Sequence, residues 1–310
     1  MQILKNNPEG IIETVHEFIE GAWVHLINPG PPEIQRISSE LGITPDMLYA
    51  PLDEDELARV EKDGVNTLVI LRIPYYQGEV HDIPYSSVPV GIIMTPRHLV
   101  TVCKVDHIIF QEFCGGHKRG LSTAKKNRFL LLLLQRTASE YLSNLRAINR
   151  AVDKLEDRLQ VSQGNREVLD LLKYQKSLVY FTTALKSNEL MLERLQRIGL
   201  FHQYPADEDL LEDVLIEIRQ AIEMVNISNN ILSQMMDAFA SIISNNLNVV
   251  MKLLALATIV LSLPTLVASI FGMNVNLPFE HSPYAFGVTM GLSIILCIIV
   301  VVVFRRRGFI

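Results

Sequence analysis

The longest apolar segments of the chain lie at its C-terminal end. Residues 249–271 and 284–304 are each long enough to cross a bilayer as a helix, because a hydrocarbon core of about 30 Å requires roughly 20 helical residues. Between residues 224 and 304 the formally charged side chains are Asp237, Lys252 and Glu280. We therefore predict two transmembrane helices, joined by a short extracytoplasmic loop at residues 272–283.

Upstream of the first span, apolar residues recur at alternating steps of four and three, interrupted only at Asn229. They are Leu211, Leu215, Ile218, Ile222, Val225, Leu232, Met236, Phe239 and Ile243. This spacing predicts a heptad seam along one helix, which we expect to need a second chain for its burial. No helix breaker occurs before Pro264, so the seam and the first span are predicted to form one helix from about Asp209 to Phe271.

The same spacing continues into the first span, but there it selects small and polar residues. The positions are Asn248, Met251, Ala255, Thr258, Ser262, Thr265 and Ser269. Such a face can line a pore if several copies turn it toward a common axis, because two spans in one chain cannot enclose a pore. It can also bond to its own helix backbone or allow close helix packing. The spacing alone leaves both interpretations open.

The first part of the chain has a different pattern. Short runs rich in β-branched residues predict strands at residues 22–27, 67–73, 88–94 and 99–103. They alternate with helical segments and predict an α/β domain over residues 1–120. A proline-free segment from about Ser122 to Leu200, with an internal Gly164, then predicts two helices, and we assign residues 121–248 to a helical stalk. The predicted fold class is an α+β membrane protein, with a stalk helix that continues into the first span.

Charge and composition narrow the function. The chain carries 28 basic and 34 acidic residues, a net charge of −6, so a nucleic-acid partner is not expected. Its polar N-terminus lacks the apolar region of a secretory signal. The loop between the spans contains no Lys or Arg, whereas a basic tail at residues 305–310 follows the second span. The positive-inside rule therefore predicts that both termini lie in the cytoplasm. The expected location is the plasma membrane.

Catalytic chemistry is not indicated. The sequence shows no phosphate loop, nucleophile elbow or paired catalytic constellation, so neither an enzyme nor an organic cofactor is predicted. Cysteine and histidine residues at positions 103, 107, 114 and 117 fit no zinc-finger spacing and are predicted to be structural. The three cysteines are expected to be free thiols.

The first span ends in Gly272-Met273-Asn274. A Gly-Met-Asn sequence at this place, followed by a short loop and a second span with a basic end, resembles the CorA family of magnesium transporters. The residue match is closest over residues 248–274. This resemblance implies a funnel-shaped homopentamer in the bilayer that takes up Mg²⁺ down the electrochemical gradient, with Co²⁺ and Ni²⁺ as further candidate ions.

The resemblance also implies roles for individual residues. Gly272, Met273 and Asn274 would form the selectivity filter, with Asn274 contacting hydrated Mg²⁺. The pore would be lined by Asn248, Met251, Leu254, Thr258, Ser262, Thr265 and Ser269. A ring of neutral amide oxygens suits Mg²⁺, because this ion gives up its water reluctantly. Intracellular Mg²⁺ would act as regulator as well as substrate, with Asp213 as one ligand, although Asp213 can also be a solvated acid near a helix start.

Two alternatives remain at this stage. A related branch of the family exports zinc but departs from Gly-Met-Asn at the loop. From a different class, the chain can be a membrane-anchored cytosolic sensor whose spans only anchor and oligomerise it. The polar face of the first span argues against that second alternative, because an anchor would function equally well with leucine throughout.

Overall fold

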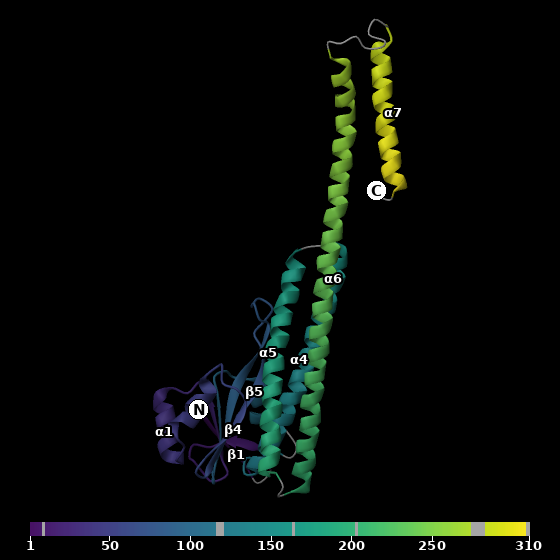
Figure 1. Cartoon of the computed structure of the whole chain (residues 1–310). Helices are drawn as coiled ribbons and strands as arrows, with labels where there is room; N and C mark the ends of the chain where they lie inside the picture. The colour runs from purple at the N-terminus through teal and green to yellow at the C-terminus, as the bar shows by residue number, and fades with distance from the viewer. Residues whose placement is uncertain (8–9, 116–120, 163–164, 202–203, 274–282, 308–310) are drawn as a thin grey trace. The chain divides into compact units, whose positions relative to one another are not determined.

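The computed structural model describes residues 1–7, 10–115, 121–162, 165–201, 204–273 and 283–307. These residues form two compact units, residues 1–234 and residues 235–310. Figure 1 shows the sheet and helices of the first unit and the two C-terminal helices of the second. The two units are described separately below.

The first unit is built on a seven-stranded sheet with the order β2-β1-β3-β7-β6-β5-β4. Its strands are β1 (Gln2–Asn6), β2 (Ile12–Thr14), β3 (Trp23–Ile27), β4 (Arg59–Asp63), β5 (Asn66–Tyr76), β6 (Tyr85–Met94) and β7 (Leu99–Cys103). Neighbouring strands are antiparallel except β3 and β7, which pair in parallel. The sequence predicted β3, β5, β6 and β7 within a few residues. It missed the short β1, β2 and β4, which carry Lys, Glu or Asn at several positions.

Alternation along β3 distributes its side chains to the two faces of the sheet. Val24 and Leu26 belong to an apolar core that includes residues of α1 (Pro31–Leu41) and α2 (Pro45–Tyr49). Trp23 lies on the other face, where its ring centroid is 4.8 Å from that of Phe129 at the start of α4 (Lys126–Ser162). Phe110 of α3 (Ile108–Cys114) packs on the same face. The sheet is therefore covered by helices on both sides.

Local sequence explains where α1 begins and ends. Proline occupies its first position, where the missing N–H has no helical partner, and the Gly30 amide donates to Glu33 Oε2 at 3.2 Å. The helix ends at Gly42, whose φ of 64° is left-handed and therefore favours glycine.

Three long helices complete the first unit. They are α4, α5 (Asn165–Ile198) and the first part of α6 (Pro205–Phe271). Ser228 of α6 bonds to Asn149 of α4 at 2.8 Å, and Arg219 pairs with Glu189 of α5 at 3.0 Å. α6 thus runs beside both other helices (Figure 1).

The heptad seam of α6 is largely buried inside a single chain. Within the first unit its buried members are Leu211, Leu215, Ile218, Val225 and Leu232. The expectation that the seam needs a second chain is therefore wrong for this part of α6. Periodicity identified the buried stripe, but it could not show that α4 and α5 of the same chain supply the partner surface.

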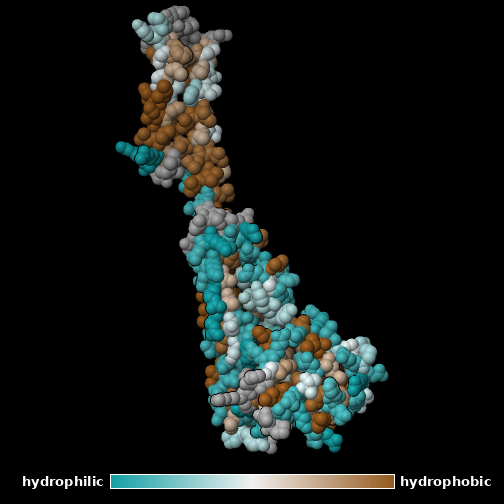
Figure 2. All heavy atoms as spheres, turned by 180° about the vertical axis from the view of Figure 1, so that it is seen from behind, coloured by the Kyte–Doolittle hydropathy of each residue, from teal (hydrophilic) through white to brown (hydrophobic). Residues whose placement is uncertain are grey.

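The second unit contains the end of α6 and α7 (Ala285–Arg306). Both helices are long and apolar enough to cross a membrane, and only 6% of the most apolar window of each is buried. Figure 2 shows apolar side chains, in brown, over much of this unit's visible surface. The predicted continuity of stalk and first span is seen, since α6 is one helix of 67 residues.

Candidate functional site

The seven residues predicted to line a pore lie on one side of α6. At about 100° per residue they fall within an arc of about 120°. All seven are exposed in the single chain: Asn248, Met251, Leu254, Thr258, Ser262, Thr265 and Ser269. An exposed face of this kind, on a helix that is long enough to span a bilayer, is available to line an aqueous path.

The second helix of this unit packs on the opposite side of α6. Buried or half-buried positions of α6 recur at Leu256, Val260, Leu263, Val267 and Phe271. This stripe lies about half a turn from the polar face. Cys297 of α7 reaches it, because its Sγ lies 3.4 Å from the Val260 carbonyl oxygen. α7 therefore leaves the polar face uncovered.

The hydroxyl groups of that face bond to the backbone of their own helix. Thr258 Oγ1 donates to the Leu254 carbonyl at 2.9 Å, and Ser262 Oγ donates to the Ile259 carbonyl at 3.0 Å. Thr265 Oγ1 does the same with the Leu261 carbonyl at 3.3 Å. Because the hydroxyl hydrogens are used in this way, the oxygen lone pairs remain as acceptors. Local bonding and a pore-lining role are thus compatible on this helix.

An open groove of about 690 Å³ follows the C-terminal half of the polar face. Its lining residues are Thr258, Leu261, Ser262, Thr265, Leu266 and Ser269. An open groove on one helix, lined by leucine as well as hydroxyl side chains, does not enclose an ion. It would have to be completed by other protein groups.

Gly272 follows directly after α6. Its amide donates to the Ala268 carbonyl at 2.9 Å, and a Cβ at this position would lie 3.2 Å from the same oxygen. Gly272 does not have a positive φ, so a side chain here would require only that the Ala268 carbonyl shift by a few tenths of an ångström. Met273 is 57% exposed. Asn274, the predicted selectivity residue, lies outside the described residues.

Asp213 is an exposed residue of α6 in the first unit. Across the described part of the chain, no group of three or more His, Cys, Asp or Glu side chains is placed to hold a metal ion. A regulatory ion bound through Asp213 would therefore need ligands beyond those that one chain brings together here.

The other residues with metal-binding chemistry are engaged elsewhere. His107 donates from Nε2 to the Pro74 carbonyl at 2.7 Å, and its Nδ1 accepts from the Ile109 amide at 3.2 Å. Burial raises the pKa of the Cys103 thiol to about 12, which disfavours the thiolate that binds metals. His117, the fourth residue of this group, lies outside the described residues. The observed contacts agree with a structural role for His107 and Cys103.

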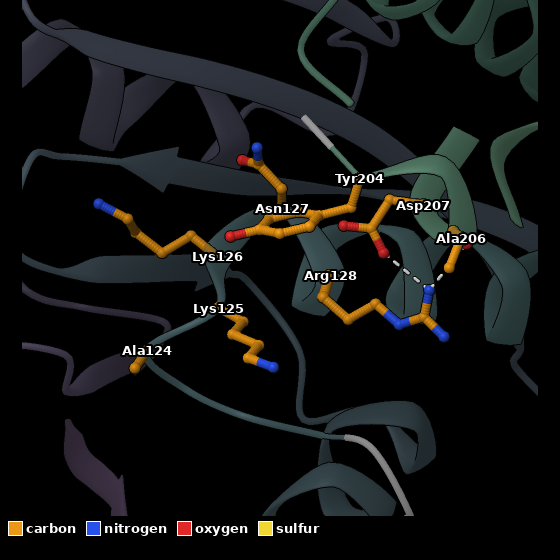
Figure 3. A pocket seen from close by; sticks show the side chains of 8 residues that line it. All are labelled: Ala124, Lys125, Lys126, Asn127, Arg128, Tyr204, Ala206 and Asp207. Atoms are coloured by element: carbon orange, nitrogen blue, oxygen red, sulfur yellow. Dashed lines mark hydrogen bonds and ion pairs between the residues drawn. The ribbon is translucent and has the colours of Figure 1, made fainter. Parts of the chain in front are cut away.

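A separate pocket of about 560 Å³ lies where α4 and α6 begin (Figure 3). Arg128 of α4 pairs with Asp207 of α6 at 2.7 Å and also donates to the Ala206 carbonyl at 3.1 Å. Lys126 Nζ points to the opposite side of the pocket and donates to the Pro96 carbonyl at 2.8 Å. These cations diverge and have partners within the chain. The contacts of Arg128 tie the starts of α4 and α6 together, and that of Lys126 ties the start of α4 to the turn between β6 and β7.

Together the fold and the apolar helices define a membrane protein with an N-terminal α/β domain and two C-terminal spans. The family model described as CorA-like Mg²⁺ transporter protein matches residues 20–306, and the chain belongs to this family. It is therefore a member of a family of Mg²⁺ and Co²⁺ transporters rather than of an enzyme family. The resemblance noted from Gly272, Met273 and Asn274 is confirmed.

Known relatives cover nearly the whole chain. The cobalt/magnesium transport protein CorA of Methanocaldococcus jannaschii is 29% identical over 301 residues, which are 93% of this chain and 91% of that protein. The protein of the same name from Thermotoga maritima is 25% identical over 327 residues, covering 96% and 86% of the two chains.

Solved structures share the fold. The complete structure of the CorA magnesium transporter from Methanocaldococcus jannaschii matches with a TM-score of 0.85 at 24% identity, covering 100% of this chain and 98% of that one. The structure of the full-length CmaX protein matches with a TM-score of 0.74 at 16% identity and covers 97% of both chains. The predicted fold class is confirmed.

Proposed function

We propose that this protein is a homo-oligomeric channel for Mg²⁺ in the plasma membrane, with both termini in the cytoplasm. The observation that carries the proposal is the exposed polar face of α6, which lies opposite the side covered by α7. A symmetric ring of chains with this face toward the axis would enclose a polar path and leave apolar surface toward lipid. We propose five copies, by resemblance to the family.

The hydroxyl geometry suits a hydrated cation. Water molecules around Mg²⁺ point their hydrogens outward, and Mg²⁺ retains several of these waters in most sites. Acceptor oxygens at Thr258, Ser262 and Thr265 would receive hydrogen bonds from that hydration shell without stripping it. At the N-terminal end of the face, Met251 and Leu254 would close the path by dewetting, with the polar Asn248 beside them.

The membrane potential would drive uptake. One elementary charge moved across 100 mV contributes about 2.3 kcal/mol, so a divalent cation gains about twice that amount when the cell interior is negative. Asn274 would select the ion at the outer entrance, with Gly272 and Met273 holding the approach to it. The assignment of Asn274 comes from its place in the sequence and from the family resemblance.

Ion flux into proteoliposomes tests the conduction path. Purified wild-type protein should carry Mg²⁺, whereas Asn274→Ala should abolish uptake and leave the oligomer intact in native mass spectrometry. Thr258→Val should lower uptake, because it replaces an acceptor oxygen by a methyl group at similar volume. Thr289→Val is the matched control, since Thr289 bonds within α7 at 2.9 Å and is not on the polar face of α6. Wild-type flux in Asn274→Ala would refute its assignment.

The same assay separates the alternatives. Competition with Co²⁺, Ni²⁺ and Zn²⁺ ranks the transported ions, and a preference for Zn²⁺ would favour the efflux branch. Absence of flux in an intact wild-type oligomer would favour the membrane-anchored sensor. A stable monomer with full transport activity would contradict the oligomeric pore.

Regulation by intracellular Mg²⁺ is the last part of the proposal. Exposed carboxylates such as Asp213 would repel one another when copies pack around an axis, and bound Mg²⁺ would relieve that repulsion and favour a closed arrangement. A ligand shifts such an equilibrium only through different affinities for the two states. Millimolar Mg²⁺ should therefore protect the stalk of the wild-type oligomer from proteolysis more than that of Asp213→Ala. Equal protection of both proteins would make Asp213 a solvated helix acid.

A further inference from the structure

Pro264 lies inside α6, in the part of the helix that is proposed to line the pore. Proline has no backbone N–H, so the hydrogen bond that residue 264 would donate to the carbonyl four residues earlier cannot form. That carbonyl belongs to Val260. Its oxygen is a strong acceptor whose desolvation is costly unless another donor is supplied.

The position of this carbonyl makes water an unsuitable donor. Val260 lies 11 residues before the end of α6 at Phe271, which corresponds to about 17 Å along the helix. A hydrocarbon core is about 30 Å thick, so Val260 lies near its middle. Val260 also belongs to the half-buried stripe that faces α7, and not to the polar face.

A donor from α7 reaches this carbonyl. Cys297 lies 12 residues after Ala285, or about 18 Å along α7, which matches the depth of Val260 below the loop. Its Sγ is 3.4 Å from the Val260 oxygen, within hydrogen-bond distance for a thiol donor. The two neighbouring hydroxyls on α7 do not serve this purpose, because Thr289 and Ser293 donate to carbonyls of α7 itself.

We infer that Cys297 is a positioning residue for the pore helix, because its thiol satisfies the Val260 carbonyl that Pro264 leaves without its helical donor. This inference rests on the proposed function, in which α6 lines the pore. Along the helix, Thr258 and Ser262 of the polar face precede Pro264, and Thr265 and Ser269 follow it. By fixing α7 to α6 at this point, the thiol bond keeps both halves of the face turned in one direction.

The inference predicts that the role of Cys297 depends on Pro264. Alanine at position 264 restores the N–H that bonds to Val260, so the thiol should then be dispensable. Serine at position 297 keeps a donor of similar size and should replace the thiol. Ser293→Ala is the matched control, because Ser293 lies one turn away on α7 and bonds only within that helix at 2.9 Å.

The test measures maximal Mg²⁺ uptake in proteoliposomes for Cys297→Ala, Cys297→Ser, Pro264→Ala and Pro264→Ala with Cys297→Ala. Interhelical hydrogen bonds in membranes change equilibria by about threefold to twentyfold, so we expect Cys297→Ala to lower uptake by about that factor. Cys297→Ser should stay within about twofold of wild type, and the Cys297→Ala loss should vanish in the Pro264→Ala background. The effect of Ser293→Ala should be equal in both backgrounds.

Infrared spectroscopy provides a readout that does not depend on transport. The S–H stretching band of Cys297, isolated as the difference between wild type and Cys297→Ser, should lie at the lowered frequency of a hydrogen-bonded thiol. A band at the frequency of a free thiol would overturn the inference, whatever the flux. Three uptake results would also overturn it. Cys297→Ala could lower uptake equally in the wild-type and Pro264→Ala backgrounds, or leave uptake unchanged in the wild-type background. Cys297→Ser could also lower uptake as much as Cys297→Ala. A bonded thiol in a protein without flux would instead refute the proposed function.

Discussion

The buried amide of Asn188 allows the stability of the first unit to be predicted from its contacts. Strand β4 pairs with β5 only as far as Ile70, so the backbone of Arg72 on β5 extends beyond the end of β4. Asn188 of α5 takes the place of the missing strand. Its Oδ1 accepts from the Arg72 amide at 3.0 Å, and its Nδ2 donates to the Arg72 carbonyl at 2.8 Å.

Replacing Asn188 by alanine should destabilise this unit by about 2–4 kcal/mol. The Arg72 carbonyl would keep the Tyr141 hydroxyl at 3.1 Å as a donor, but the buried Arg72 amide would lose the acceptor that it has in the wild type. An unsatisfied buried N–H costs about 1–3 kcal/mol, and the second lost bond adds about 1 kcal/mol. A change of this size is a substantial part of the 5–15 kcal/mol that usually stabilises a folded domain.

Urea unfolding followed by tryptophan fluorescence measures the effect. Trp23 is the single tryptophan of the chain, and it is fully buried in this unit. With a slope of about 3 kcal/mol per molar urea, the midpoint of Asn188→Ala should fall by about 1 M. Lys186→Ala, at an exposed position of the same helix, should change the midpoint very little. Equal midpoints for the two variants would refute the reasoning.

Two further predictions use the same probe. Gly91→Ala should lower the urea midpoint clearly, because a Cβ would lie 2.1 Å from Cγ of the rigid Pro51 ring. Gly115→Ala is the control and should have little effect, because there the atom nearest to a Cβ is 3.4 Å away. Similar midpoints for the two variants would show that Pro51 moves aside freely. Burial lowers the pKa of His25 to about 4, so the unfolded chain gains a proton between about pH 6.5 and 4 that the folded chain does not. Stability should therefore fall by about 2 kcal/mol between pH 8 and pH 5, and His25→Phe should lack this part of the slope; equal slopes in both proteins would exclude His25 as the cause.

Much of the architecture could be predicted from the sequence because it depends on composition and period. The two spans follow from length and apolarity, and the four predicted strands follow from β-branched runs. Gly-Met-Asn at the end of the first span identified the family before any contact was known. Strands β1, β2 and β4 could not be predicted, because short edge and near-edge strands have little of the apolar alternation that marks a buried one.

The candidate site was predicted as a set of positions on one helix. The period of α6 placed Thr258, Ser262, Thr265 and Ser269 on a common face, and the structure shows that this face is exposed. Its role in conduction remains a prediction, as do the roles of Asn274 and Asp213. The sequence left open whether the hydroxyls bond to their own helix, and the structure shows such bonds for Thr258, Ser262 and Thr265.

Contacts between distant segments were decided by the tertiary structure alone. Periodicity marks the stripe of a helix that is buried, but any apolar surface of matching shape can bury it, and here α4 and α5 cover part of the α6 seam. The partnership of Cys297 with the carbonyl freed by Pro264 has no sequence signal, because it depends on the depth and rotation at which α7 packs against α6. Local sequence determines where each element begins, ends and turns its apolar side, whereas the pairing of those sides depends on shape and hydrogen bonding between residues far apart in the chain.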